Sequence, residues 1–70
     1  MLMTTIMKVS SSSGKEFLEV ESNDDNYTLK NQQGVTVAKR SKDDEVGVTS
    51  LMEFINNLTE NYGWKTENLV

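Results

Sequence analysis

The stretch VSSSSGKEF, residues 9–17, holds the Gly-Lys pair with which a phosphate-binding loop ends. Such a loop follows the pattern G-x-x-x-x-G-K-[ST], in which the first glycine forms the turn and the final hydroxyl contacts magnesium. In this chain Val9 stands where the first glycine is needed, and Glu16 stands where the hydroxyl residue is needed. A strand pattern rather than a helix pattern follows. We therefore interpret Gly14 and Lys15 as part of a turn between two strands.

Two acidic clusters, NDDN at residues 23–26 and KDDE at residues 42–45, contain the carboxylates that calcium and magnesium prefer. An EF-hand loop that began at Asp24 would need a glycine as its sixth residue, but that residue is Leu29. Weak, adventitious cation binding at residues 43–45 stays open. The chain contains neither histidine nor cysteine, which excludes zinc sites built on imidazole or thiolate and catalytic Ser-His or Cys-His pairs. We predict no cofactor, no ordered metal site and no enzymatic activity.

A third set of residues is typical of a surface that binds single-stranded nucleic acid, because it combines cations with an aromatic ring on one side of a sheet. Its members are Lys8, Phe17, Lys30 and Arg40. A strand meander followed by one helix also resembles, in topology only, the single-stranded-DNA-binding domain of the PC4 coactivator family. Against this function, the net charge of −4 repels a phosphate backbone. In addition, Glu19 and Glu21 are predicted on the same face, where they can pair with the lysines across strands.

These residues must be positioned by four short runs in which apolar and polar side chains alternate, the pattern of half-buried strands. The runs are residues 4–10, 15–21, 26–31 and 34–40. In the first run, Met7 and Val9 share one face, while Ile6 and Lys8 share the other. The segments SSSSG, SNDDN and NQQG between the runs are turn-forming, and Gly34 suits a left-handed position in a hairpin loop. The pattern predicts an antiparallel meander.

The segment SLMEFINNLTENY, residues 50–62, has the apolar periodicity of an amphipathic helix. Ser50 and Glu53 form a capping-box pattern at its start, and Gly63 is placed to end it in a left-handed conformation. We expect Trp64 to fold back on the helix. Residues 41–48 are predicted to form a connecting loop with a short edge strand at Val46 and Val48 as an option.

Together these elements predict an α+β fold in which a four-stranded antiparallel β-meander packs on one C-terminal α-helix, in the order β-β-β-β-α. Residues 1–64 form one small domain and residues 65–70 a frayed tail. A chain of 70 residues buries only about 60% of the surface that it exposes when unfolded, so its core must be efficient. The predicted core is Met7, Val9, Leu18, Val20, Tyr27, Leu29, Val35, Val37, Phe54, Ile55, Leu58 and Trp64.

The exposed side of the predicted helix is the candidate protein contact, and it consists of Met52, Glu53, Asn56, Asn57 and Glu60. With catalysis, metals and a basic field excluded, we expect an acidic protein-binding domain that acts as a regulator, inhibitor or accessory subunit. Open edge strands would also allow two copies to pair as a homodimer. No apolar segment is long enough to cross a membrane, and the N-terminal residues lack a secretion signal, so we expect a cytoplasmic protein.

Overall fold

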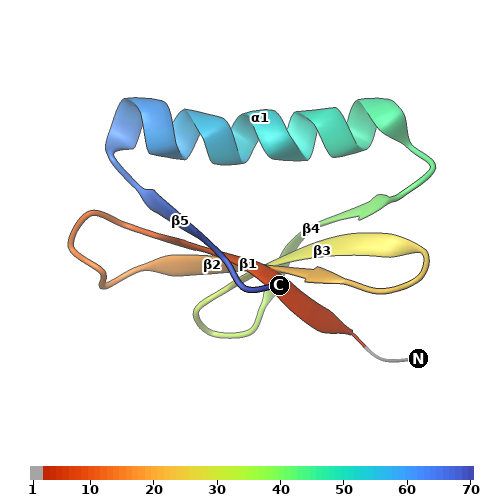
Figure 1. Cartoon of the computed structure of the whole chain (residues 1–70), viewed down its shortest axis with the longest axis horizontal. Helices are drawn as coiled ribbons and strands as arrows, with labels where there is room; N and C mark the ends of the chain where they lie inside the picture. The colour runs from red at the N-terminus through yellow and green to blue at the C-terminus, as the bar shows by residue number, and fades with distance from the viewer. Residues whose placement is uncertain (1–2) are drawn as a thin grey trace.

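The computed structural model describes residues 3–70 and shows five antiparallel strands with one helix lying across the sheet (Figure 1). The sheet order is β4-β3-β2-β1-β5, so the first four strands form the predicted meander. The predicted α+β fold is confirmed. The elements are β1 (Thr4–Ser10), β2 (Phe17–Ser22), β3 (Asn26–Asn31), β4 (Thr36–Ser41), α1 (Glu45–Tyr62) and β5 (Lys65–Asn68).

The Gly-Lys pair lies in the turn between β1 and β2, as predicted. The turn is closed by the backbone amide of Ser11, which donates to the carbonyl oxygen of Glu16 at 2.8 Å. Gly14 has φ 77° and Gly34, in the turn between β3 and β4, has φ 79°. Residues with a side chain rarely adopt this left-handed conformation, which explains glycine at both turns.

Two β-bulges shift the alternation of side chains. One lies in β1 between Thr5 and Met7, and the other lies opposite the step from Leu29 to Lys30, where Val37 is the extra residue. An extra residue reverses the face on which the following side chains lie relative to an unbroken strand. Consequently Ile6, predicted on the solvent face, packs against the core.

The core contains five buried apolar side chains, which come from the three central strands and the helix. They are Val9, Val20, Leu29, Leu51 and Ile55. Half-buried side chains surround them, namely Ile6, Met7, Leu18, Tyr27, Ala38, Leu58 and Trp64. The prediction was wrong for three residues, because Val35 is 55%, Val37 52% and Phe54 47% exposed. The bulge at Val37 explains the error in β4, because Ala38 rather than Val37 takes the core-facing position opposite Leu29.

The helix is longer than predicted, because it begins at Glu45 rather than near Ser50. Asp44 is its N-cap, and the Asp44 Oδ1 accepts a hydrogen bond from the Gly47 amide at 3.0 Å. The predicted loop and edge strand around Val46 are therefore wrong. The predicted end is confirmed: Gly63 has φ 71°, and the Trp64 amide donates to the Leu58 carbonyl oxygen at 3.1 Å.

Residues 65–70 do not form the predicted frayed tail. Lys65–Asn68 form β5, which pairs with β1 so that Lys8 faces Glu67 and Ser10 faces Lys65. The Leu69 amide also donates to the Ile6 carbonyl oxygen at 3.0 Å. Figure 1 shows the chain leaving the end of α1 and returning to β1 as β5. Because β1 is at the edge of the meander, its outer backbone groups are left to pair with β5.

Candidate protein-interaction surface

Charge is distributed unevenly along the chain. Residues 43–62, which comprise α1 and the two residues before it, contain five acidic residues and no lysine or arginine. The rest of the chain contains seven basic and six acidic residues, so the net charge of −4 arises from the helical segment. A surface of one sign attracts partners of the opposite sign and accelerates their encounter.

The carboxylates of α1 lie on one side of the helix, and we call this side the acidic face. It is defined by Glu45, Thr49, Glu53, Asn56 and Glu60, all of which are classed as exposed. Steps of three and four residues connect them, so they follow one another along the axis. With a rise of about 1.5 Å per residue, Glu45 and Glu53 are about 12 Å apart along the helix, and Glu53 and Glu60 about 10 Å.

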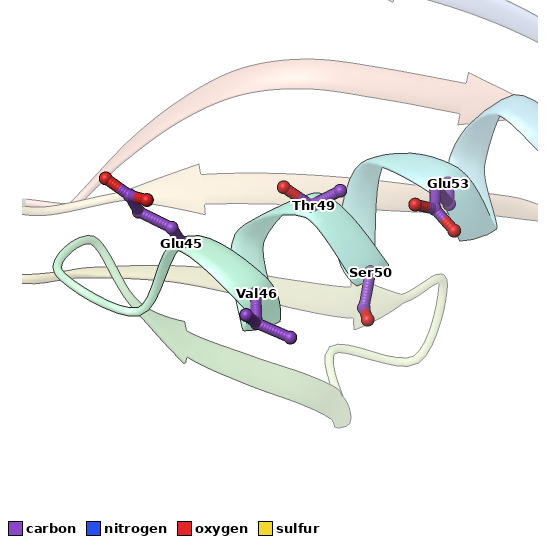
Figure 2. A pocket seen from close by; sticks show the side chains of 5 residues that line it. All are labelled: Glu45, Val46, Thr49, Ser50 and Glu53. Carbon is purple, nitrogen blue, oxygen red and sulfur yellow. The ribbon is translucent and has the colours of Figure 1, made fainter.

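All five residues predicted as a protein contact are exposed on α1: Met52, Glu53, Asn56, Asn57 and Glu60. The structure adds Glu45 and Thr49. The predicted helix starts at Ser50, which leaves Glu45 in the predicted loop and Thr49 in no predicted element. Figure 2 shows the first half of this surface, where Glu45, Val46, Thr49, Ser50 and Glu53 line a shallow depression. An Asp followed by Glu at the head of an apolar pattern is a helix-start signal that could have identified Glu45.

No ion pair within residues 3–70 involves a carboxylate of the acidic face; Lys30 and Glu21, on the sheet, form the ion pair found there. The polar side chains nearby bond mainly within the helix. The Thr59 hydroxyl donates to the Asn56 carbonyl oxygen at 2.8 Å, and the Asn61 amide donates to the Asn57 side chain. Glu45, Glu53 and Glu60 therefore remain available to cations from another molecule.

The proposed nucleic-acid contacts are divided between the two faces of the sheet. Lys8, Phe17 and Lys30 lie on the outer face, opposite α1, and the Lys8 Nζ is 4.4 Å from the centroid of the Phe17 ring. Arg40 is the exception, because it pairs with Tyr27 on the helix side and its Cδ approaches Gly47 of α1. Its predicted place on the outer face is wrong, since the bulge at Val37 reverses the alternation in β4.

Acidic residues separate the remaining cations of the outer face. Glu19 pairs with Lys8 on one side and with Lys30 on the other, and Glu67 pairs with Lys8 from β5. The Lys30 Nζ is 2.7 Å from the Glu21 Oε1. Cross-strand pairs of opposite charge lower the positive potential that a phosphate backbone would meet.

The described residues hold neither a cluster of metal ligands nor a membrane-spanning helix. Among residues 3–70, no three carboxylates gather closely enough to hold a metal ion. In the same part of the chain, no helix combines the length and the hydrophobicity needed to cross a membrane. Comparisons of the chain with protein-family models, curated proteins and solved structures found no match.

Proposed function

We propose that this protein is a non-catalytic regulator, inhibitor or accessory subunit that binds a basic surface of another protein through the acidic face of α1. The observation that carries the proposal is the row of exposed carboxylates at Glu45, Glu53 and Glu60, which form no ion pair within residues 3–70. They lie on a segment that contains no lysine or arginine. We place its action in the cytosol. The fold needs no oxidising compartment, because the chain contains no cysteine.

Charge complementarity would supply the orientation and speed of binding, while apolar contacts would supply much of the lifetime of the complex. Met52 and Val46 flank the acidic face and are 58% and 79% exposed. Protein interfaces combine buried apolar side chains with polar groups around them. Here the two apolar side chains lie on either side of the carboxylates, so each can contact the partner next to a charged group. The helix would therefore present the acidic face and the two exposed apolar side chains on one rigid element.

The proposal is tested by affinity capture from an extract of the source cells with tagged wild-type protein and two charge-reversal variants. Glu53→Lys changes the acidic face, and Glu16→Lys makes the same charge change in the exposed turn between β1 and β2. We expect one stoichiometric partner that is retained by Glu16→Lys, lost by Glu53→Lys and released by added salt. Equal retention by both variants, or no partner for the wild type, would contradict the proposal.

Single-stranded nucleic acid is the second candidate ligand. The contact between Lys8 and Phe17 favours it, because a base can stack on an aromatic ring while the adjacent cation meets a phosphate. Arg40 lies on the other face, and Lys39 takes an outer position in its place. The surrounding Glu19, Glu21 and Glu67 reduce the support for this ligand. We rank it below protein binding for this reason.

A second copy of the chain is a further candidate partner, through pairing of β4 with its symmetry mate. β4 is an edge strand, and Val37 within it and Val35 directly before it are more than half exposed. Antiparallel pairing across a two-fold axis would cover these valines in both copies. Sedimentation at high concentration tests this contact: a mass near 7.9 kDa would exclude it, and Val37→Lys should abolish any dimer.

A further inference from the structure

An apolar cavity of about 210 Å³ lies between α1 and the sheet, on the side of the helix away from β4. The strands contribute Ile6, Met7 and Tyr27 to its walls, and the helix contributes Val48, Met52 and Ile55. A cavity of roughly 150 Å³ holds a benzene molecule, so this one is large enough for one Leu, Ile, Met or Phe side chain.

The bulge in β1 helps to form this cavity. In a regular strand Ile6 would point to the outer face, with Lys8, but the extra residue allows it to turn toward the helix and line the cavity. Bulges occur frequently beside binding sites, where they redirect a side chain. The core at this point is therefore incompletely filled although an additional isoleucine is directed into it.

Two methionines line the cavity, and their flexible side chains adapt to ligands of different shape. Met52 is 58% exposed, so it lies at the opening, whereas Ile55 is buried and belongs to the inner wall. Met52 also adjoins the acidic face, because Glu45 lies almost two turns before it and Asn56 lies one turn after it. One ligand can therefore reach the cavity and the acidic face together.

The surroundings of Tyr27 add negative charge at the same end of the molecule. The loop before Tyr27 contains Asp24 and Asp25, and the loop before α1 contains Asp43 and Asp44. The two loops are adjacent, because the Lys42 amide donates to the Asp25 carbonyl oxygen at 2.8 Å. Two cations, Lys42 and Arg40, offset part of this charge: the Lys42 Nζ lies 5.0 Å from the centroid of the Tyr27 ring, and Arg40 pairs with Tyr27 in the sheet.

We infer that this cavity receives one large apolar side chain of the basic protein partner, flanked in the partner's sequence by lysine or arginine. The inference rests on the proposed function, and it defines the chemistry of the partner. The apolar walls select the anchor side chain, and the acidic residues on either side select its cationic neighbours. Nucleic acid would not satisfy this site, since it has no aliphatic anchor and carries the wrong charge.

The test uses short capped peptides in which a central guest residue, Leu or Ala, is flanked on both sides by Lys or by Ser. The full chain carries ¹³C-labelled methionine methyl groups, and each peptide is titrated while the methyl signals are recorded by NMR. The Met7 and Met52 methyls report on the cavity. The Met3 methyl is the control, because Met3 is exposed and does not line the cavity.

We expect the Lys-flanked Leu peptide to shift the Met7 and Met52 signals and to bind about tenfold more tightly than the Lys-flanked Ala peptide. With Ser flanks the preference for Leu should persist at lower affinity. Equal binding of the Leu and Ala peptides would overturn the cavity inference and leave the acidic face supported. Binding that is the same with Lys and Ser flanks would overturn the proposed electrostatic function and leave the cavity supported.

A pair of variants distinguishes binding in the cavity from nonspecific hydrophobic binding elsewhere on the surface. Met52→Ser removes an apolar side chain at the opening without changing charge, and Met3→Ser makes the same change outside the cavity. Both positions are exposed, so the fold should tolerate both changes. We expect Met52→Ser to abolish the preference for Leu over Ala and Met3→Ser to retain it. Retention of the preference in both variants would overturn the assignment of the anchor to this cavity.

Discussion

Replacement of Asp44 by alanine tests where the helix that carries the acidic face begins. The Asp44 carboxylate accepts a hydrogen bond from the Gly47 amide at 3.0 Å, and it places a negative charge at the positive end of the helix dipole. Loss of an N-cap of this kind costs about 1 kcal/mol of unfolding free energy. For a domain of this size, that corresponds to a decrease of about 4–8 °C in Tm, measured by circular dichroism during thermal unfolding.

Ser50→Ala is the matched control, because the sequence pattern favours Ser50 as the cap. In the structure Ser50 lies inside α1 and is exposed, where alanine is the better helix former. We expect its Tm to equal or slightly exceed that of the wild type. A larger loss of Tm for Ser50→Ala than for Asp44→Ala would refute the helix start at Glu45.

A double-mutant cycle that combines Gly47→Ala with Asp44→Ala tests the contact between the cap and Gly47. Inside a helix, replacement of glycine by alanine normally stabilises by about 1 kcal/mol. Here the added Cβ would overlap the Asp44 Oδ2 and would lie 2.8 Å from the Arg40 Cδ. The Arg40 side chain must move in either background, whereas the Asp44 carboxylate obstructs the Cβ only in the wild type. We therefore expect Gly47→Ala to lower Tm in the wild type and to be clearly less destabilising in the Asp44→Ala background. Additive effects of the two substitutions would show that the cap does not contact Gly47 in solution.

Three further predictions concern the core, the last strand and the outer face. Ile55→Ala should reduce the unfolding free energy by about 2–5 kcal/mol in denaturant titrations, whereas half-exposed Phe54→Ala should cost clearly less. Truncation after Trp64 should lower Tm and reduce hydrogen-exchange protection of β1, because β5 pairs with it; unchanged protection would argue against β5. If single-stranded DNA shifts the protein in gels at low salt, Lys8→Glu should weaken the shift and Arg40→Glu should not, since Lys8, unlike Arg40, shares the outer face with Phe17.

Alternation and turn chemistry were sufficient to predict the meander. The regular parts of the strands place Val9, Val20 and Leu29 in the core as predicted, and Gly14 and Gly34 lie in the expected turns. The errors in β4 begin at Val37, because nothing in the sequence GVTVAKR marks the position of a bulge. A bulge depends on how the partner strand twists and packs, which is a tertiary property.

The sequence does not predict the start of α1 or the strand β5, for different physical reasons. At the helix start, Gly47 lowers intrinsic helix propensity, yet Asp44 caps the first turn and outweighs it. In β5, all four residues of Lys65–Asn68 are exposed, so no apolar alternation marks the strand. Its formation depends on the free edge of β1 and on the position at which Gly63 returns the chain.

The candidate contact surface could be predicted in part because it depends on helical periodicity, which the sequence shows directly. Glu53, Asn56 and Glu60 are exposed on α1 as expected, while Glu45 was missed together with the first turns of the helix. The cavity beside Met52 could not be predicted, because it requires Ile6 to leave the outer face at a bulge.

The bulge at Val37 also bears on the choice between the two candidate functions. In an unbroken β4, Arg40 would join Lys8 and Lys30 on the outer face and strengthen a surface for phosphates. The extra residue instead places Arg40 on the helix side, with its Cδ near Gly47 in the first turns of α1. The same bulge places Lys39 on the outer face, where it pairs with Thr28, so the outer face exchanges an arginine for a lysine. On the helix, Glu45, Glu53 and Glu60 remain free of ion pairs within residues 3–70. The carboxylates of α1, rather than the register of β4, therefore favour a basic protein over nucleic acid as the partner.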